Sequence, residues 1–90
     1  MQKKIAVIVR ERQAEALRMA VGLTLEDDEI SVYIMDSRLD LNDPVITMNV
    51  DMLNDLGVRV ASNIPENNVG IISTEDIAGI LPQYDSVIPY

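Results

Sequence analysis

The chain has 90 residues, a length that accommodates one small domain with a single hydrophobic core. It carries 7 Lys and Arg against 15 Asp and Glu, and the resulting formal net charge of −8 disfavours binding to nucleic acid or to an anionic membrane surface. The lack of Cys and His excludes disulfides, thiolate catalysis and cysteine-based metal sites, and it removes the usual general base.

The first third of the chain alternates between strand-like and helical patterns. Residues 5–9 (IAVIV) form a continuous β-branched run, typical of a strand buried on both faces of a parallel sheet. Residues 12–25 have helical spacing, and residues 30–35 (ISVYIM) predict a second strand. The acidic connector at residues 26–29 is interpreted as a solvated turn rather than a cation site. The helix is expected to bury Ala14, Leu17, Val21 and Leu25, together with Ala16, Ala20 and Leu23.

A second helix is predicted to end before Gly57. Asp43 suits its N-cap, Pro44 its first position, and Gly57 the position after its last turn. Its start is ambiguous because residues 46–50 also alternate as in a strand, so residues 49–56 are the better-defined part. The apolar residues at helical spacing, which we expect to face the core, are Val45, Met48, Met52 and Leu56. Met19, Met35, Met48 and Met52 are interpreted as core residues.

The last third repeats the alternation with shorter elements. Residues 58–61 predict a third strand, and residues 62–68, with one proline and three asparagines, predict an exposed loop. Ser73 suits the N-cap of a last helix, and residues 85–88 predict a final strand. The residues expected on the buried side of the last helix are Ile77, Ala78, Ile80 and Leu81.

The order β-α-β-α-β-α-β predicts one α/β domain over residues 1–90. We expect a small flavodoxin-like three-layer sandwich, with a mainly parallel sheet of about four to five strands and helices on both faces. Ligands in such folds collect beyond the carboxyl ends of the strands. This edge, called the strand-end rim below, is expected at residues 9–12, 35–38, 61–64 and 89–90.

The strand-end rim offers ligand-binding residues but no recognisable catalytic set. The loop after the first strand has no glycine, which excludes a Rossmann fingerprint or a P-loop, yet its two arginines could hold a small anion. Ser62 follows the third strand, where a nucleophile would sit, but the chain has no His to activate it. Asp36, Asp40 and Asp43 are interpreted as solvated carboxylates rather than metal ligands. The candidate ligand-binding residues are Arg10, Arg12, Asp36, Arg38, Ser62 and Asn63.

Six segments spread over nearly the whole chain carry a family resemblance. They are residues 4–9 (KIAVIV), 15–23 (EALRMAVGL), 32–35 (VYIM), 69–71 (VGI), 74–78 (TEDIA) and 85–90 (DSVIPY). Together they resemble the DsrE/DsrF-like family of small sulfur-relay proteins. The resemblance implies a flavodoxin-like α/β unit that assembles into dimers, trimers or hexamers. It also implies, for many members, a cysteine in the second half that carries sulfur as a persulfide.

The stretch that corresponds to this cysteine, residues 60–64 (VASNI), has no thiol. The Ser62 hydroxyl cannot take its place, because a hydroxyl neither forms a persulfide nor ionises near neutral pH. Sulfur-relay chemistry is therefore not expected of this chain, and neither is a metal or a cofactor.

Two functions remain open. In the first, the chain is a non-catalytic member of this family that acts as a structural or docking subunit. It would belong to a homo-oligomer, or to a hetero-oligomer with a cysteine-bearing paralogue, with a link to intracellular sulfur transfer. In the second, it is a stand-alone module that binds a small anion or other small ligand at the strand-end rim. An enzyme that uses carboxylates alone is the weakest interpretation.

The sequence also predicts where the protein acts. It has no apolar run of the ~20 residues that a membrane span needs, and no signal peptide is evident. We therefore expect a cytoplasmic protein whose partners include neither nucleic acid nor a membrane.

Overall fold

The computed structural model describes residues 3–26 and 28–90. The helices and strands in chain order are β1 (Lys4–Val9), α1 (Gln13–Leu23), β2 (Glu29–Ile34), α2 (Pro44–Asp55), β3 (Arg59–Ser62), β4 (Gly70–Ile71), α3 (Thr74–Ile80) and β5 (Ser86–Pro89). Single-turn 3-10 helices lie at Thr24–Glu26, Pro65–Asn67 and Leu81–Gln83. The expected alternation is confirmed, and the two-residue β4 is an additional strand. Within the described residues, no helix is long and apolar enough to cross a membrane.

All five strands run parallel in one sheet, in the order β4-β3-β2-β1-β5. The chain steps outward from β1 through β2 and β3 to β4, and then returns to the other side of β1 as β5. The direction of winding therefore reverses between β1 and β5, where Ile8 pairs with Pro89. Because the strands are parallel, their carboxyl ends meet at one edge, which is where α/β folds bind ligands.

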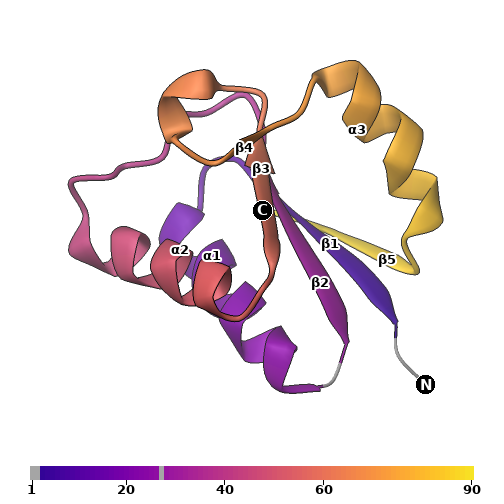
Figure 1. The fold of residues 1–90 in the computed structure, drawn as a ribbon, viewed down its shortest axis with the longest axis horizontal. Coiled ribbons are helices and arrows are strands. Elements are labelled where there is room, and N and C mark those ends of the chain that lie inside the picture. Colours follow the sequence, from indigo (N-terminus) through magenta and orange to yellow (C-terminus); the bar gives the residue numbers. More distant parts are fainter. Residues whose placement is uncertain (1–2, 27) are drawn as a thin grey trace.

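Helices cover both faces of the sheet, so the three-layer α/β sandwich is confirmed (Figure 1). Alternate residues of each strand point to opposite faces. In β1, Ile5, Val7 and Val9 pack with α1 and α2, whereas Ala6 and Ile8 belong to the cluster that includes α3. The sequence of β1 after Lys4 is an unbroken apolar run because both faces of the strand are covered.

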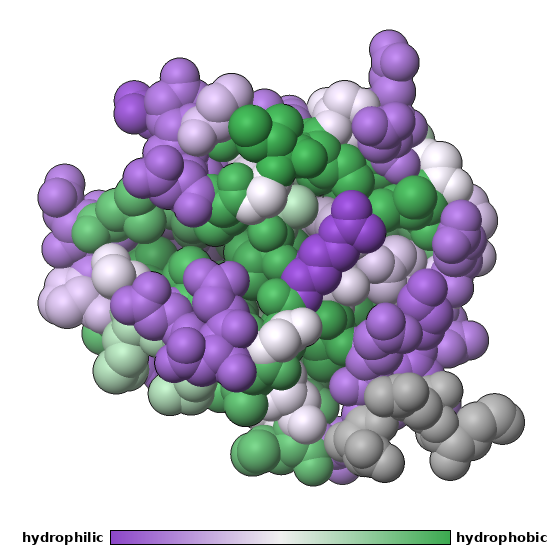
Figure 2. Space-filling model, in the orientation of Figure 1, coloured by the Kyte–Doolittle hydropathy of each residue, from purple (hydrophilic) through white to green (hydrophobic). Residues whose placement is uncertain are grey.

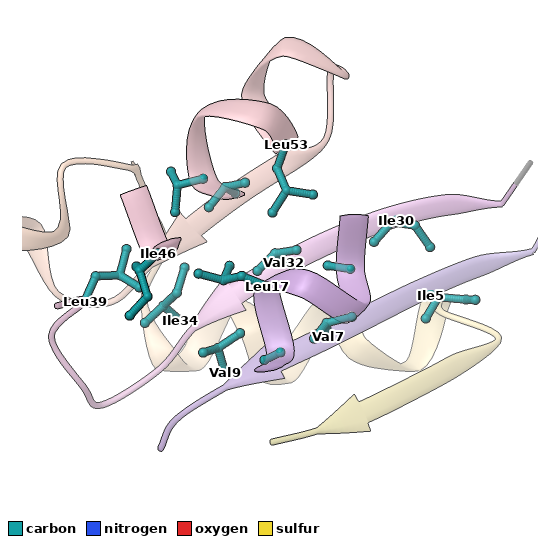
Figure 3. Close-up of a cluster of buried hydrophobic side chains, with 14 residues drawn as sticks. Ile5, Val7, Val9, Leu17, Ile30, Val32, Ile34, Leu39, Ile46 and Leu53 are labelled. Atoms are coloured by element: carbon teal, nitrogen blue, oxygen red, sulfur yellow. The ribbon is translucent and has the colours of Figure 1, made fainter. Parts of the chain in front are cut away.

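The face under α1 and α2 is closely packed. Leu17 of α1 and Leu53 of α2 are fully buried, and Figure 3 shows both pointing toward the strands, with Leu17 beside Val32. Ala16 and Ala20 are also fully buried, and their small side chains let α1 lie close to the sheet.

The buried side of α2 differs from the prediction. Its buried residues are Ile46, Asn49, Val50 and Leu53. The residues expected in the core are exposed instead: Val45, Met48, Met52 and Leu56. The assignment of Met48 and Met52 to the core was therefore wrong. Apolar residues occupy more than half of the circumference of α2, and the sheet together with α1 buries only one part of that arc.

Two smaller predictions of buried residues also fail. Leu25 lies in the 3-10 turn after α1 and is 83% exposed, because the helix ends two residues before it. Ala78 is exposed on α3, where Ile77 is the buried residue. Both residues lie at the edge of the apolar stripe of their helix. There, a small rotation of the helix or its early end decides whether the side chain is buried.

The predicted caps of α2 and α3 are confirmed. The Asp43 carboxylate accepts a hydrogen bond from the Val45 amide at 2.9 Å, with Pro44 in the first helical position. The Ser73 hydroxyl accepts one from the Asp76 amide at 3.0 Å. Gly57 has a φ of +76° after α2, the left-handed conformation that glycine adopts without steric cost.

Candidate functional site

A cavity of about 550 Å³ opens at the strand-end rim between α3 and the sheet. Its apolar wall consists of residues from the ends of β1, β2 and β5 and from α3: Ile8, Met35, Pro89, Ile77 and Leu81. We call it the strand-end cavity. It lies beside the reversal between β1 and β5, the position where open α/β sheets bind ligands.

The length of α3 explains why the cavity exists. The helix has seven residues, Thr74–Ile80, whereas α1 and α2 on the other face have 11 and 12. Two full-length helices fill one face, but α3 covers only part of the opposite face (Figure 1). The cavity lies along α3, between the helix and the carboxyl ends of the strands.

The mouth of the strand-end cavity carries the polar groups. Arg10 follows β1, Asp36 follows β2, and Thr74 begins α3. Glu11 and Tyr90 complete the mouth. The Tyr90 carbonyl accepts hydrogen bonds from the amides of Arg10 and Glu11, at 2.9 and 3.3 Å, so the backbone is fixed where the charged side chains begin. An apolar wall with a few polar groups at one end is the usual form of a small-molecule site.

Asp36 is held at this mouth by an unusual backbone. Its φ is +60°, a left-handed conformation that aspartate tolerates better than most residues. The Asp36 amide donates to Asn63 Oδ1 at 2.9 Å, and Asn63 Nδ2 donates back to the Asp36 carboxylate at 2.8 Å. Asn63 Nδ2 also donates to Thr74 Oγ1 at 3.1 Å. Asn63 therefore joins the ends of β2, β3 and α3, and it positions the carboxylate rather than lining the cavity.

Ser62 lies inside the protein, fully buried. Its hydroxyl accepts hydrogen bonds from the Ile64 amide at 3.0 Å and from Asn67 Nδ2 at 2.9 Å. Asn67 is also buried; it accepts from the Leu39 amide at 2.7 Å and donates to the Ser37 carbonyl at 3.0 Å. These contacts connect the loops that follow β2 and β3. The buried Ser62 hydroxyl therefore has a structural role: it holds the two loops together and is not exposed as a nucleophile would be.

Arg12 and Arg38 lie apart from the strand-end cavity. They line a second, more polar hollow of about 450 Å³ at the start of α1, together with Glu11 and Asp40. Gln13 shapes it: its Nε2 donates to the Arg38 carbonyl at 2.7 Å, and its Oε1 accepts from the Asp40 amide at 3.0 Å. The predicted rim residues thus divide into three groups: Arg10 with Asp36 and Asn63, Arg12 with Arg38, and Ser62 alone.

The three aspartates weighed as metal ligands have separate surroundings. Asp36 pairs with Asn63, Asp40 accepts from the Asn42 amide at 3.3 Å, and Asp43 caps α2. In the part of the chain that the structure describes, no three acidic side chains gather into a group that could hold a metal ion.

Sequence reasoning missed a pair of tyrosines on the α3 face. The hydroxyls of Tyr33 and Tyr84 lie 2.6 Å apart, and their rings meet edge to face with centroids 6.2 Å apart. Arg59 lies over the Tyr33 ring, and Lys4 lies over the Tyr84 ring. Burial raises the pKa of Tyr33 to about 12, and the hydrogen bond with Tyr84 contributes in the same direction. Tyr33 therefore keeps its proton at neutral pH.

The sequence also did not predict that Asn67 is buried, for a different reason. It stands in a segment with one proline and three asparagines, a composition that predicts an exposed loop. Its burial depends on loops brought together by the sheet, which leave no periodic signal in the sequence. Tyr33, by contrast, sits in a predicted strand, and only its partner from the other end of the chain was unpredictable.

Comparison of the chain with protein-family models, with curated proteins and with solved structures found no match. The resemblance to the DsrE/DsrF-like family therefore stays a prediction.

Proposed function

We propose that this chain is a non-catalytic binding protein, which holds a small and mostly apolar molecule with one anionic group in the strand-end cavity. The observation that carries the proposal is an apolar cavity of about 550 Å³ at the β1/β5 reversal, with an arginine at its mouth. Cavities of this size and lining are typical of ligand sites in proteins.

The lining determines the class of ligand. Ile8, Met35 and Ile77 offer only apolar contact, so they favour a hydrocarbon or ring system as the body of the ligand. Arg10 at the mouth is the cation that suits a carboxylate, sulfonate or phosphate. Asp36 faces the same mouth, and its charge disfavours a ligand with more than one anionic group.

The proposed role is binding rather than catalysis. The side-chain groups at the mouth are a guanidinium, two carboxylates and a hydroxyl, and the chain contains neither His nor Cys. The Tyr90 phenol lies on the other face, where it donates to Met19 Sδ at 3.2 Å. Asp36 and Thr74 each accept a hydrogen bond from Asn63, which fixes them in place and occupies one acceptor site on each. These residues suit recognition of a polar head group.

Three probes of equal chain length test this proposal: octanoate, octanol and octylammonium. We expect octanoate to raise the melting temperature most and to shift the amide NMR signals of residues that line the strand-end cavity. Arg10→Ala should weaken octanoate binding about tenfold, because it removes a charge-assisted contact. Arg12→Ala is the matched control, with the same charge change two residues away, and it should leave binding unchanged.

Two further results decide the outcome. Ala78→Phe places a ring at the cavity wall and should abolish binding of all three probes while the fold persists. The proposal is wrong if no probe shifts these signals, or if Arg12→Ala weakens octanoate binding as much as Arg10→Ala does.

A second function is favoured by a separate observation. The exposed apolar residues of α2 form a row along its outer side, and such a surface favours a role as a structural or docking subunit of an oligomer. The expectations of a homo-oligomer, or of a complex with a cysteine-bearing paralogue linked to sulfur transfer, belong to this proposal. Sedimentation velocity of the chain at increasing concentration tests the first of them, and a constant monomer would exclude it.

A further inference from the structure

The outer side of α2 presents a continuous apolar row. Its residues and exposed fractions are Val45 (37%), Met48 (56%), Met52 (40%) and Leu56 (53%). Their spacing of three and four residues places them along one side of the helix. We call them the α2 row. In Figure 2, green and pale-green atoms lie among purple ones at the left of the view, where Figure 1 places α2.

A groove of about 620 Å³ runs beside the α2 row. Leu41, Met48 and Met52 supply its apolar lining, and Asp51 and Asp55 stand on its border. Methionine side chains are flexible and polarizable, so they adapt to partners of different shape and are common on surfaces that bind helices. The groove therefore offers apolar contact to side chains of a partner.

The charges around the groove have one sign. The charged residues in its lining are Asp51 and Asp55, and both are acidic. Asp51 and Asp55 are exposed one helical turn apart, on the same border of the groove. A partner that covers the α2 row must place its own side chains next to these carboxylates. Positively charged side chains are therefore favoured at those positions of the partner.

We propose that the α2 row and its groove are a docking site for a basic amphipathic helix of a partner protein. The partner helix would place apolar residues against Met48 and Met52, and Lys or Arg against Asp51 and Asp55. This inference rests on the second proposed function and names the class of partner. It is independent of the strand-end cavity, which lies on the opposite face of the sheet.

A second copy of this chain fits the site less well. Pairing two α2 rows about a twofold axis would bring Asp51 and Asp55 of both copies into one interface. Like charges placed together in an interface are unfavourable, and the described residues that line the groove include no Lys or Arg to offset them.

The test uses three amidated peptides of about 18 residues, or five helical turns. One has leucine at amphipathic helical spacing and lysine elsewhere. The second keeps the leucines and replaces every lysine with glutamate, and the third scrambles the leucine/lysine sequence. We expect the first alone to bind measurably and to shift amide NMR signals of α2. Signals around the strand-end cavity should stay in place.

Variants with matched controls locate the site. Asp51→Asn with Asp55→Asn should weaken binding of the leucine/lysine peptide about fivefold, whereas Glu66→Gln with Glu75→Gln makes the same change of net charge elsewhere and should change it less than twofold. Met48→Lys with Met52→Lys should weaken binding more than tenfold. Its control, Ile71→Lys with Val87→Lys, adds two charges at other exposed apolar positions on β4 and β5.

Three outcomes would overturn the proposal. Equal weakening by the two acid-to-amide pairs would show general attraction to an acidic protein. Equal binding of the scrambled peptide would show that a helical face is not recognised. Sedimentation of the chain alone as a dimer, which Met48→Lys with Met52→Lys converts to a monomer, would make a second copy the occupant and would support the second proposed function without the basic helix.

Discussion

The two faces of the sheet are built differently. On one face, α1 and α2 bury a continuous cluster that includes Leu17 and Leu53 (Figure 3). On the other, the shorter α3 buries Ile77, and the remaining surface contains the strand-end cavity and a tyrosine pair. The first face has the packing that stabilises a small domain, whereas the second leaves space for a ligand.

In this small domain, one face of the sheet provides most of the stability and the other provides the candidate binding site. With 90 residues, the chain has little apolar surface to spare, so most of the packing is concentrated under two helices. The face with fewer helical residues is held partly by polar contacts, Tyr33 with Tyr84 and Asn63 with Asp36 and Thr74. Substitutions on the two faces should therefore differ in size and in kind.

The largest expected difference is between two core truncations. Leu53→Ala should lower the free energy of unfolding by about 3–4 kcal/mol, because Leu53 is fully buried between α2 and the sheet. Ile77→Ala should cost about 2 kcal/mol, since Ile77 already borders the strand-end cavity and has fewer contacts to lose. Urea denaturation measures both values. Equal costs would mean that the α3 face is as tightly packed as the other.

Asn67→Ala should cost about 2–3 kcal/mol, because it leaves the Leu39 amide, the Ser37 carbonyl and the Ser62 hydroxyl without this partner. The control is Asn54→Ala at an exposed position of α2, which should change stability by less than about 0.5 kcal/mol. A small effect of Asn67→Ala would show that the loops after β2 and β3 hold together without the buried amide.

The tyrosine pair gives the α3 face a pH dependence at high pH. Unfolded Tyr33 loses its proton near pH 10, whereas the native residue, with a pKa raised to about 12, keeps it. The unfolded state therefore binds fewer protons between pH 10 and 12, and stability falls as the pH rises through this range. Comparing urea denaturation of the wild type and Tyr33→Phe isolates this contribution.

Tyr33→Phe should also cost about 1 kcal/mol near neutral pH, where it removes the hydrogen bond to Tyr84. Tyr84→Phe is the second control, and it should reduce the alkaline decline without abolishing it, because burial of Tyr33 remains. Identical alkaline curves for wild type and Tyr33→Phe would contradict the raised pKa.

The smallest expected changes in stability are for substitution of glycine by alanine. Gly22→Ala in α1 and Gly79→Ala in α3 each place a methyl group in open space and should stabilise the protein by about 0.5–1 kcal/mol. Gly70→Ala in β4 should destabilise it, because the new Cβ would lie 3.1 Å from the Val60 carbonyl. Thermal unfolding measures all three. A loss of stability for Gly79→Ala would show that the position is not open and that a Cβ there meets a neighbour.

Much of the architecture was predictable because it depends on local pattern. The unbroken apolar run at β1 predicted a strand covered on both faces, the pattern at residues 30–35 predicted β2, and Asp43, Gly57 and Ser73 predicted helix caps. The strand-end rim was predicted in part. Arg10 and Asp36 reach the same cavity because parallel strands bring their carboxyl ends together.

Other residues could not be placed from the sequence. Arg12 stands two positions from Arg10, yet it lines a different hollow, since it lies where α1 begins rather than where β1 ends. Ser62 and Asn67 look like loop residues, but they are buried because two loops distant in sequence meet over β3. Such contacts depend on the arrangement of whole elements.

The sequence by itself determined most of the strands and helices, the caps of α2 and α3 and that the sheet is parallel, because these features follow from spacing, caps and short connections within a few residues. Only the tertiary structure decided the strand order, the strand-end cavity and the buried side of α2. The apolar arc of α2 is wider than one interface, so its sequence permits either half to face the core. The choice is made by the fit of Ile46, Val50 and Leu53 against the sheet and α1, and it leaves the α2 row at the surface.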